Sequence, residues 1–93
     1  METYLILANF IDPGKMDAEQ AGAMMSRVQA TAKSLSISVS SWLITMGHYD
    51  SVLIIQSPNA GIAAKFAMLL ASNGLRTQTL RAFSPEEAAG LLA

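Results

Sequence analysis

Two segments of this chain carry aliphatic side chains at both odd and even positions, and this pattern restricts the fold more than any other feature. They are TYLILANF at residues 3–10 and YDSVLIIQS at residues 49–57. Successive side chains of a strand point to opposite faces of its sheet. A strand that is apolar on both parities therefore needs cover on both faces. The sequence predicts a sheet that is buried on two sides.

The first strand is followed by a breaker segment and a helix. IDPGKMD at 11–17 contains the residues that end regular structure. Over residues 17–35 the apolar positions recur at helical spacing, which predicts a helix with one apolar stripe. The stripe consists of Ala21, Met24, Met25, Val28, Ala32 and Leu35.

Two further strands and a second helix follow. ISVSSWLITM at 37–46 predicts a strand whose apolar parity changes at a bulge near Ser40–Ser41. After the strand at 49–57, the cap candidates in 57–59 open a helix that Asn73-Gly74 ends. LRTQTLRAF at 75–83 is polar enough to predict a strand at the edge of the sheet.

The last ten residues carry the clearest local signal. In SPEEAAGLL, Ser84 is an N-cap, Pro85 occupies the first helical position and Glu87 lies three residues after the cap. This arrangement is a capping box. A short terminal helix is therefore predicted.

The order β-α-β-β-α-β followed by a short helix predicts one domain over residues 1–93, an α+β ferredoxin-like sandwich. Its two helices can cover only one face of the sheet. Charged residues make up 14% of the chain, against about 25% in a typical soluble protein, so polar cover is scarce. We expect a second copy to cover the other face, which would make a homo-oligomer and a dimeric α/β barrel.

Composition argues against several other classes of protein. The net charge is −1 and the six basic residues are scattered, unlike the basic stripe of a nucleic-acid or membrane-surface protein. The start METYLILANFID lacks the positive region of a signal peptide, and GIAAKFAMLLA is too short to cross a bilayer. Without cysteine the chain has no disulfide or thiolate chemistry. We expect a cytoplasmic protein without cofactor or metal.

The stretch MGHYD at 46–50 contains the single histidine of the chain. If Met46 ends one strand and Tyr49 begins the next, Gly47-His48 forms a two-residue type II′ turn, because glycine tolerates a positive φ. His48 would then lie at an exposed tip. This register pairs Met46 with Tyr49, Thr45 with Asp50 and Leu43 with Val52.

These residues also carry a resemblance. GHYD at 47–50, preceded by LIT, is similar to the Gly-Tyr-Asp motif of the GYD domain family, and RTQTLRAFSPEE at 76–87 resembles that family's C-terminal strand and helix cap. The likeness spans essentially the whole chain, with His48 at a position that varies in the family. It implies a ferredoxin-like fold that pairs as a dimeric α/β barrel, and it implies no established activity.

Each candidate site residue has a functional and a structural interpretation. His48 could be a general base or a metal ligand, but an exposed turn residue is favoured because only carboxylates could complete a metal site. Asp50 could be a buried base with Tyr49 beside it. The favoured alternative is that Asp50 accepts backbone N–H groups and Tyr49 packs across the hairpin.

The remaining candidates lie on the central and last strands. Thr77, Thr79 and Arg81 share one parity, and Arg81 or Arg76 could hold a carboxylate; the alternative is a solvated or dimer-contacting edge, and the parity that faces inward is open. Trp42 beside Met46 and Met68 could line an apolar pocket, although core or interface packing is favoured. The candidate ligand-binding set is Trp42, Thr45, Tyr49, Asp50, Thr77, Thr79 and Arg81.

Two functions remain open. The first is a non-catalytic homo-oligomeric module that binds a small apolar or carboxylate ligand or has a structural or regulatory role. The second is a cofactor-free isomerase or monooxygenase acting on a small aromatic or polyketide-like substrate in the barrel cavity. Its weak catalytic candidates are Asp50 as base, with Tyr49 and Arg81 as orienting donors. The enzyme rests on analogy between folds, and a fold does not determine a function.

Overall fold

The computed structural model describes residues 1–12, 14 and 17–93 and confirms the predicted order of elements. The breaker segment at 11–17 includes residues 13, 15 and 16, which lie outside the described part of the chain. The elements are β1 (Glu2–Phe10), α1 (Ala18–Ser34), β2 (Ser38–Ile44), β3 (Ser51–Ser57), α2 (Ala60–Ser72), β4 (Leu75–Ala82) and α3 (Pro85–Leu92).

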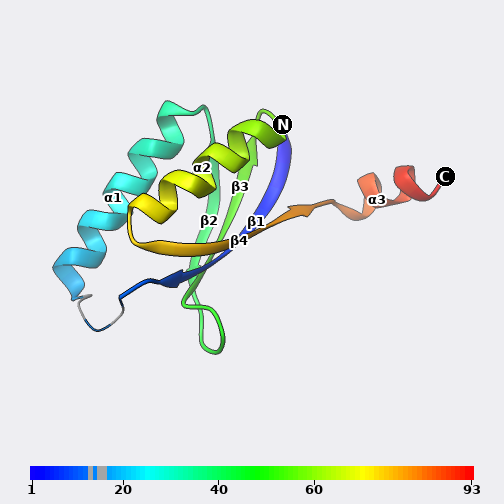
Figure 1. Cartoon of the computed structure of the whole chain (residues 1–93). Coiled ribbons are helices and arrows are strands. Elements are labelled where there is room, and N and C mark those ends of the chain that lie inside the picture. The colour runs from blue at the N-terminus through cyan, green and yellow to red at the C-terminus, as the bar shows by residue number, and fades with distance from the viewer. Residues whose placement is uncertain (13, 15–16) are drawn as a thin grey trace.

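The four strands form one antiparallel sheet in the order β2-β3-β1-β4. The two most apolar strands, β1 and β3, therefore lie in the middle, and β4 is at an edge as predicted. Helices α1 and α2 lie side by side on one face of the sheet (Figure 1). The register of β2 against β3 shifts between Val39 and Ser41, which confirms the predicted bulge. The fold is the α+β ferredoxin-like sandwich.

The face beneath the helices contains the core. Three even-numbered residues of β1, Tyr4, Ile6 and Ala8, and the odd-numbered residues of β3, among them Leu53 and Ile55, are buried there. The helices contribute Met24, Val28 and Ala32 from α1 and Ala63, Phe66 and Leu70 from α2. Met25, predicted as part of the α1 stripe, is instead 40% exposed, because neighbouring helical positions point about 100° apart and Met24 takes the inward place.

Side-chain caps fix where both long helices begin. The Asp17 carboxylate accepts the Gln20 N–H at 2.7 Å at the start of α1, and the Asn59 amide oxygen accepts the Ile62 N–H at 2.8 Å at the start of α2. These bonds satisfy donors that the first turn leaves free. Gly74, at φ +87°, lets the chain turn from α2 into β4 as predicted.

The other face of the sheet carries aliphatic side chains and no helix. We call it the open face; its aliphatic residues are Leu5, Leu7, Leu43, Val52, Ile54 and Leu80. They are contiguous, since Leu5 pairs with both Ile54 and Leu80 while Val52 pairs with both Leu7 and Leu43. All six are partly or largely exposed in the single chain.

The β2–β3 connection differs from the predicted two-residue turn. The register Leu43–Val52 is confirmed, but the strand ladder ends at Ile44–Ser51, so the loop spans 45–50. The Thr45 hydroxyl donates to the Tyr49 carbonyl at 2.5 Å, and the Thr45 N–H donates to the Asp50 carbonyl at 3.0 Å. These bonds, together with the contacts of Asp50 to β1, hold the chain in a wider loop. Gly47 has the positive φ expected of it, +114°.

The short helix α3 stands apart from the rest of the domain. Its capping box is confirmed: the Ser84 N–H donates to Glu87 Oε1 at 3.0 Å and the Glu87 N–H donates to Ser84 Oγ at 3.1 Å. None of its residues is buried, and Figure 1 shows it projecting beyond the end of β4. Across the residues described, the structure contains no helix with the length and apolar character needed to cross a bilayer.

Candidate functional site

The candidate base Asp50 is tied to the end of β1 by three hydrogen bonds. Its carboxylate oxygen Oδ2 accepts the Phe10 N–H at 2.8 Å. Its own N–H donates to the Ala8 carbonyl at 2.9 Å and to Asn9 Oδ1 at 2.8 Å. A carboxylate that accepts a backbone N–H beyond the last paired residues anchors the loop to the sheet. This geometry agrees with the favoured interpretation, in which Asp50 accepts a backbone N–H.

Tyr49 reaches over the sheet to the edge strand. Its hydroxyl donates to Gln78 Oε1 on β4 at 2.8 Å. Gln78 pairs with Leu7, so the Tyr49 hydroxyl lies at the rim of the open face. The predicted packing of Tyr49 against Met46 does not form, because Met46 is 99% exposed at the loop tip. His48 beside it is also exposed, as predicted.

The structure answers which parity of β4 faces the helices. Thr77, Thr79 and Arg81 pair with Ala8, Ile6 and Tyr4, so these three candidates lie on the helix side of the sheet. The opposite parity faces outward on the open face. Its residues are Arg76, Gln78, Leu80 and Ala82.

Arg81 is occupied by its own surroundings. Its Nη1 donates to the Thr3 carbonyl at 3.1 Å and also to the Ala82 carbonyl. The guanidinium lies 4.2 Å from the ring centroid of Phe83 and 5.5 Å from that of Tyr4, both within cation–π range. Arg81 thus holds the C-terminal end of β4 beside the N-terminal end of β1.

Tyr4 beneath Arg81 has a perturbed phenol. Its hydroxyl donates to Glu2 Oε1 at 2.6 Å. This hydrogen bond, followed by burial and by the negative charge of Glu2, raises the pKa of Tyr4 above its ordinary value of 10.0, while Arg81 partly opposes the shift. Tyr4 therefore stays protonated and acts as a donor at neutral pH.

The three weak catalytic candidates are not brought together. Asp50 contacts the C-terminal end of β1, at Ala8 to Phe10, whereas Arg81 contacts its N-terminal end, at Thr3 and Tyr4. Ala8 lies five residues further along the strand than Thr3, a distance of about 17 Å at 3.3 Å per residue. A single small substrate would not touch both side chains in one chain.

Trp42 belongs to the helix side and not to a pocket with methionines. It pairs with Leu53 and packs against the buried cluster. Its Nε1 atom is buried and, among the described residues, has no hydrogen-bond partner; the Ser51 hydroxyl shares this condition. Met46 and Met68 are 99% and 72% exposed, so neither is packed with Trp42 into an enclosed pocket.

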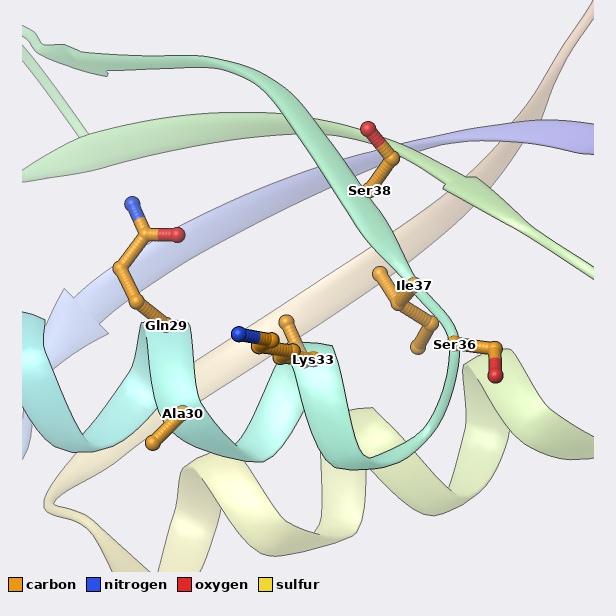
Figure 2. A pocket seen from close by; sticks show the side chains of 7 residues that line it. Gln29, Ala30, Lys33, Ser36, Ile37 and Ser38 are labelled. Atoms are coloured by element: carbon orange, nitrogen blue, oxygen red, sulfur yellow. The ribbon is translucent and has the colours of Figure 1, made fainter.

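Two grooves lie on the helix side of the molecule. The first, of about 510 Å³, lies between the end of α1 and the start of β2 and is lined by Gln29, Ala30, Ala32, Lys33, Ser36, Ile37 and Ser38 (Figure 2). The second, of about 430 Å³, lies between α2 and β4 and is lined by Ile11, Ala67, Met68, Ala71, Leu75, Arg76 and Thr77. Of the predicted ligand-binding set, Thr77 lines the second groove, and none of the other six lines either.

Sequence reasoning missed Asn9 and Gln78. Asn9 pairs with Arg76 across β1 and β4, and its side chain accepts the Asp50 N–H. Asn9 and Arg76, together with Gln78 and Tyr49, form a polar rim at one end of the open face. The signal was present in the sequence, since Arg76 and Gln78 share a parity with Leu80, but the side that this parity faced could not be read from β4 alone.

The described residues contain no cluster of three or more histidine or acidic side chains arranged to hold a metal ion. The two carboxylates nearest each other in sequence, Glu86 and Glu87, lie in the first turn of α3, where Glu87 closes the capping box. What the site region offers is an apolar surface with a polar rim.

Several solved structures share this fold. The leucine response regulatory protein LrpA of Mycobacterium tuberculosis has a TM-score of 0.64 and 13% identity, over 89% of this chain and 51% of that one. This chain thus spans about half the length of LrpA. FFRP-DM1 has a TM-score of 0.61 and 17% identity, over 89% of this chain and all of that one.

The protein TTHA0845 of Thermus thermophilus has a TM-score of 0.56 and 24% identity, over 90% of this chain and 95% of that one. These likenesses show the fold. A search of curated proteins found no match. The model of the GYD domain matches residues 4–92, which include the strands, the GHYD loop and the capped terminal helix. The chain belongs to the GYD domain family.

Proposed function

We propose that this protein is a homodimeric, non-catalytic module in which two copies stack their open faces. The observation that carries the proposal is the contiguous set of six aliphatic side chains on the face of the sheet that no described helix covers. Exposed apolar patches of this kind mark association sites in small proteins. An isologous pair would bury the same face of both copies and complete the cover that β1 and β3 require.

We place a small ligand between the stacked sheets. The centre of the open face is aliphatic, and Arg76, Asn9 and the Tyr49–Gln78 pair supply polar groups at one end. Arg76 is exposed and, among the described residues, makes no ion pair, so its guanidinium can donate hydrogen bonds to a ligand carboxylate. A small apolar molecule with a carboxylate matches this surface. LrpA is described as responding to leucine, which agrees in size and chemistry, although its likeness to this chain shows the fold alone.

A regulatory or structural role is favoured over catalysis by the state of Asp50. Its carboxylate accepts the Phe10 N–H, and its neighbours Asn9 and Ala8 hold its backbone. This arrangement supports an anchoring role for Asp50, and no observation favours the isomerase or monooxygenase.

Native mass spectrometry and sedimentation of the purified protein test the proposal. The expected mass is twice that of the 9.9 kDa chain. Ile54→Glu places a charge at the centre of the open face and should yield monomers, while Ala64→Glu on the exposed side of α2 should leave the dimer intact. A wild-type protein that stays monomeric at high concentration would overturn the proposal. Mass retained beyond the two chains would identify the ligand.

A further inference from the structure

We infer that α3 is an exchanged arm, which docks into the groove between α2 and β4 of a second copy. This inference rests on the proposed dimer and adds to it a second contact surface. We call residues 83–93 the arm and the groove lined by Ile11, Ala67, Met68, Ala71, Leu75, Arg76 and Thr77 the α2/β4 groove.

The arm is well specified in sequence, but among the described residues its helix buries no side chain against its own chain; Phe83, before the helix, contacts the Arg81 guanidinium. Its capping box and first-position proline define a helix of eight residues. Isolated helices of this length are marginal in water and are normally held by packing on an apolar surface. Here Phe83, Leu91 and Leu92 are 46%, 65% and 89% exposed. A surface outside the chain is therefore needed to bury them.

The arm of one chain is badly placed to reach its own α2/β4 groove. The groove touches the first residues of β4, Leu75 to Thr77, whereas the arm leaves from the last one, Ala82. Ala82 lies five residues further along the strand than Thr77, a distance of about 17 Å at 3.3 Å per residue. Figure 1 shows α3 directed away from the sheet and not back along β4.

Stacking two open faces removes this separation. A two-fold axis that lies between the sheets and runs across the strands sets β4 of each copy over β4 of the other, in opposite directions. The end of one β4 then lies over the start of its partner's β4, where the groove is. Stacked sheets are about 10 Å apart. An eight-residue helix is about 12 Å long, enough to pass from one sheet to the other.

The chemistry of the arm matches this groove. Ile11 and Met68 are 50% and 72% exposed and would be covered by the leucines of the arm. Of the groove's lining residues, Arg76 is the charged one. The arm carries two acidic residues in its first turn and no basic residue in its last turn, so its negative charge favours a neighbouring cation.

The alternative two-fold axis, parallel to the strands, would bring the arm to the groove between α1 and β2. Four of the seven residues that line that groove are polar or charged, namely Gln29, Lys33, Ser36 and Ser38 (Figure 2). Burying Leu91 and Leu92 there would desolvate polar groups that the arm cannot hydrogen-bond. The α2/β4 groove is therefore the favoured partner surface.

Crosslinking of single-cysteine variants tests the placement, because the chain contains no cysteine of its own. Chains carrying Met68→Cys are mixed with chains carrying Leu91→Cys, equilibrated at a concentration where native mass spectrometry finds dimers, and treated with a short bismaleimide. Covalent heterodimers are expected. Chains carrying Ser36→Cys replace Met68→Cys as the matched control for the other groove, and few crosslinks are expected.

The outcomes separate this inference from the proposed dimer. Dimers without the Met68–Leu91 crosslink, or with crosslinks to Ser36→Cys instead, would overturn the docking of the arm and leave the stacked sheets standing. Monomers at every concentration would overturn both.

Measurement of the dimer dissociation constant gives a second, independent test. The variant Leu91→Glu/Leu92→Glu should raise it at least about tenfold, since two leucines lose their apolar contact. Met25→Glu, which adds a single negative charge to the exposed surface of α1, should leave it within about twofold. An unchanged constant in the arm variant would show that α3 does not contribute to the dimer.

Discussion

On β3, Leu53 and Ile55 are fully buried beneath α1 and α2, whereas Val52 and Ile54 lie on the open face of the same strand and remain partly exposed. β1 shows the same contrast between Ile6 and its neighbours Leu5 and Leu7. All of these side chains are aliphatic, so residue type does not distinguish the faces. What differs is the cover: the helices α1 and α2 cover one face of the sheet, and no described helix covers the other.

Truncation of Leu53 gives the largest effect expected from this contrast. Leu53→Ala removes a fully buried side chain and leaves a cavity, which should lower the free energy of unfolding by about 2–5 kcal/mol. Urea unfolding followed by circular dichroism measures the change. Because the site lies inside one chain, the loss should be the same at every protein concentration.

The matched variant on the open face is Ile54→Ala. At protein concentrations low enough to give monomers, the loss should be well below that of Leu53→Ala, because Ile54 is already partly exposed. As dimers form, the difference from wild type should grow, since an interface stabilises the folded state by mass action. An Ile54→Ala loss as large as that of Leu53→Ala in the monomer would erase the contrast between the faces.

The loop between β2 and β3 meets both faces and gives an intermediate effect. Asp50→Ala leaves the Phe10 N–H without its acceptor and should lower the free energy of unfolding by about 1–3 kcal/mol. Asp50→Asn keeps an acceptor oxygen and should cost less. His48→Ala, at the exposed tip of the same loop, should change stability by less than about 0.5 kcal/mol. A large effect of His48→Ala would give this histidine a role that its exposure does not explain.

Much of the fold could be predicted because its signals are local. The apolar parity of β1 and β3, the bulge of β2 at Val39 to Ser41 and the cap of α3 each depend on residues adjacent in sequence. The pairing of Leu43 with Val52 followed from the same local spacing. These features are set by periodicity and by hydrogen bonds within a few residues.

The site was harder to predict because its contacts join distant segments. Asp50 is positioned by Phe10, Asn9 and Ala8, about forty residues earlier, and this contact widens the loop that local turn preferences predict to be tight. Arg81 is held by the Thr3 carbonyl at a separation of 78 residues. Sequence spacing grouped Arg81 with Asp50 as candidates, but strand direction places them at opposite ends of β1.

The smallest and most local effect is expected in the arm, where the stability of α3 depends on pH. The Ser84 N–H, which donates to the Glu87 carboxylate, holds the pKa of Glu87 below its ordinary value of 4.5, and the Ser84 hydroxyl adds to the shift. A carboxyl group whose pKa is lowered in the folded helix stabilises that helix at pH values above its ordinary pKa. This stabilisation is lost as the pH falls through the pKa of the folded state. The helix α3 should therefore fray as the pH falls below 4.5.

Amide chemical shifts of Ser84 and of residues 85–92 measure this fraying, preferably in the monomeric variant Ile54→Glu, where docking of the arm cannot hold the helix. The Leu53 amide, beneath the helices, serves as the internal reference and should not respond over the same range. Glu87→Gln should abolish the pH dependence while keeping a neutral acceptor for the Ser84 N–H. If the chemical shifts of α3 and of the Leu53 amide change over the same pH range, the arm is coupled to the core. The prediction that α3 frays independently of the rest of the chain would then be wrong.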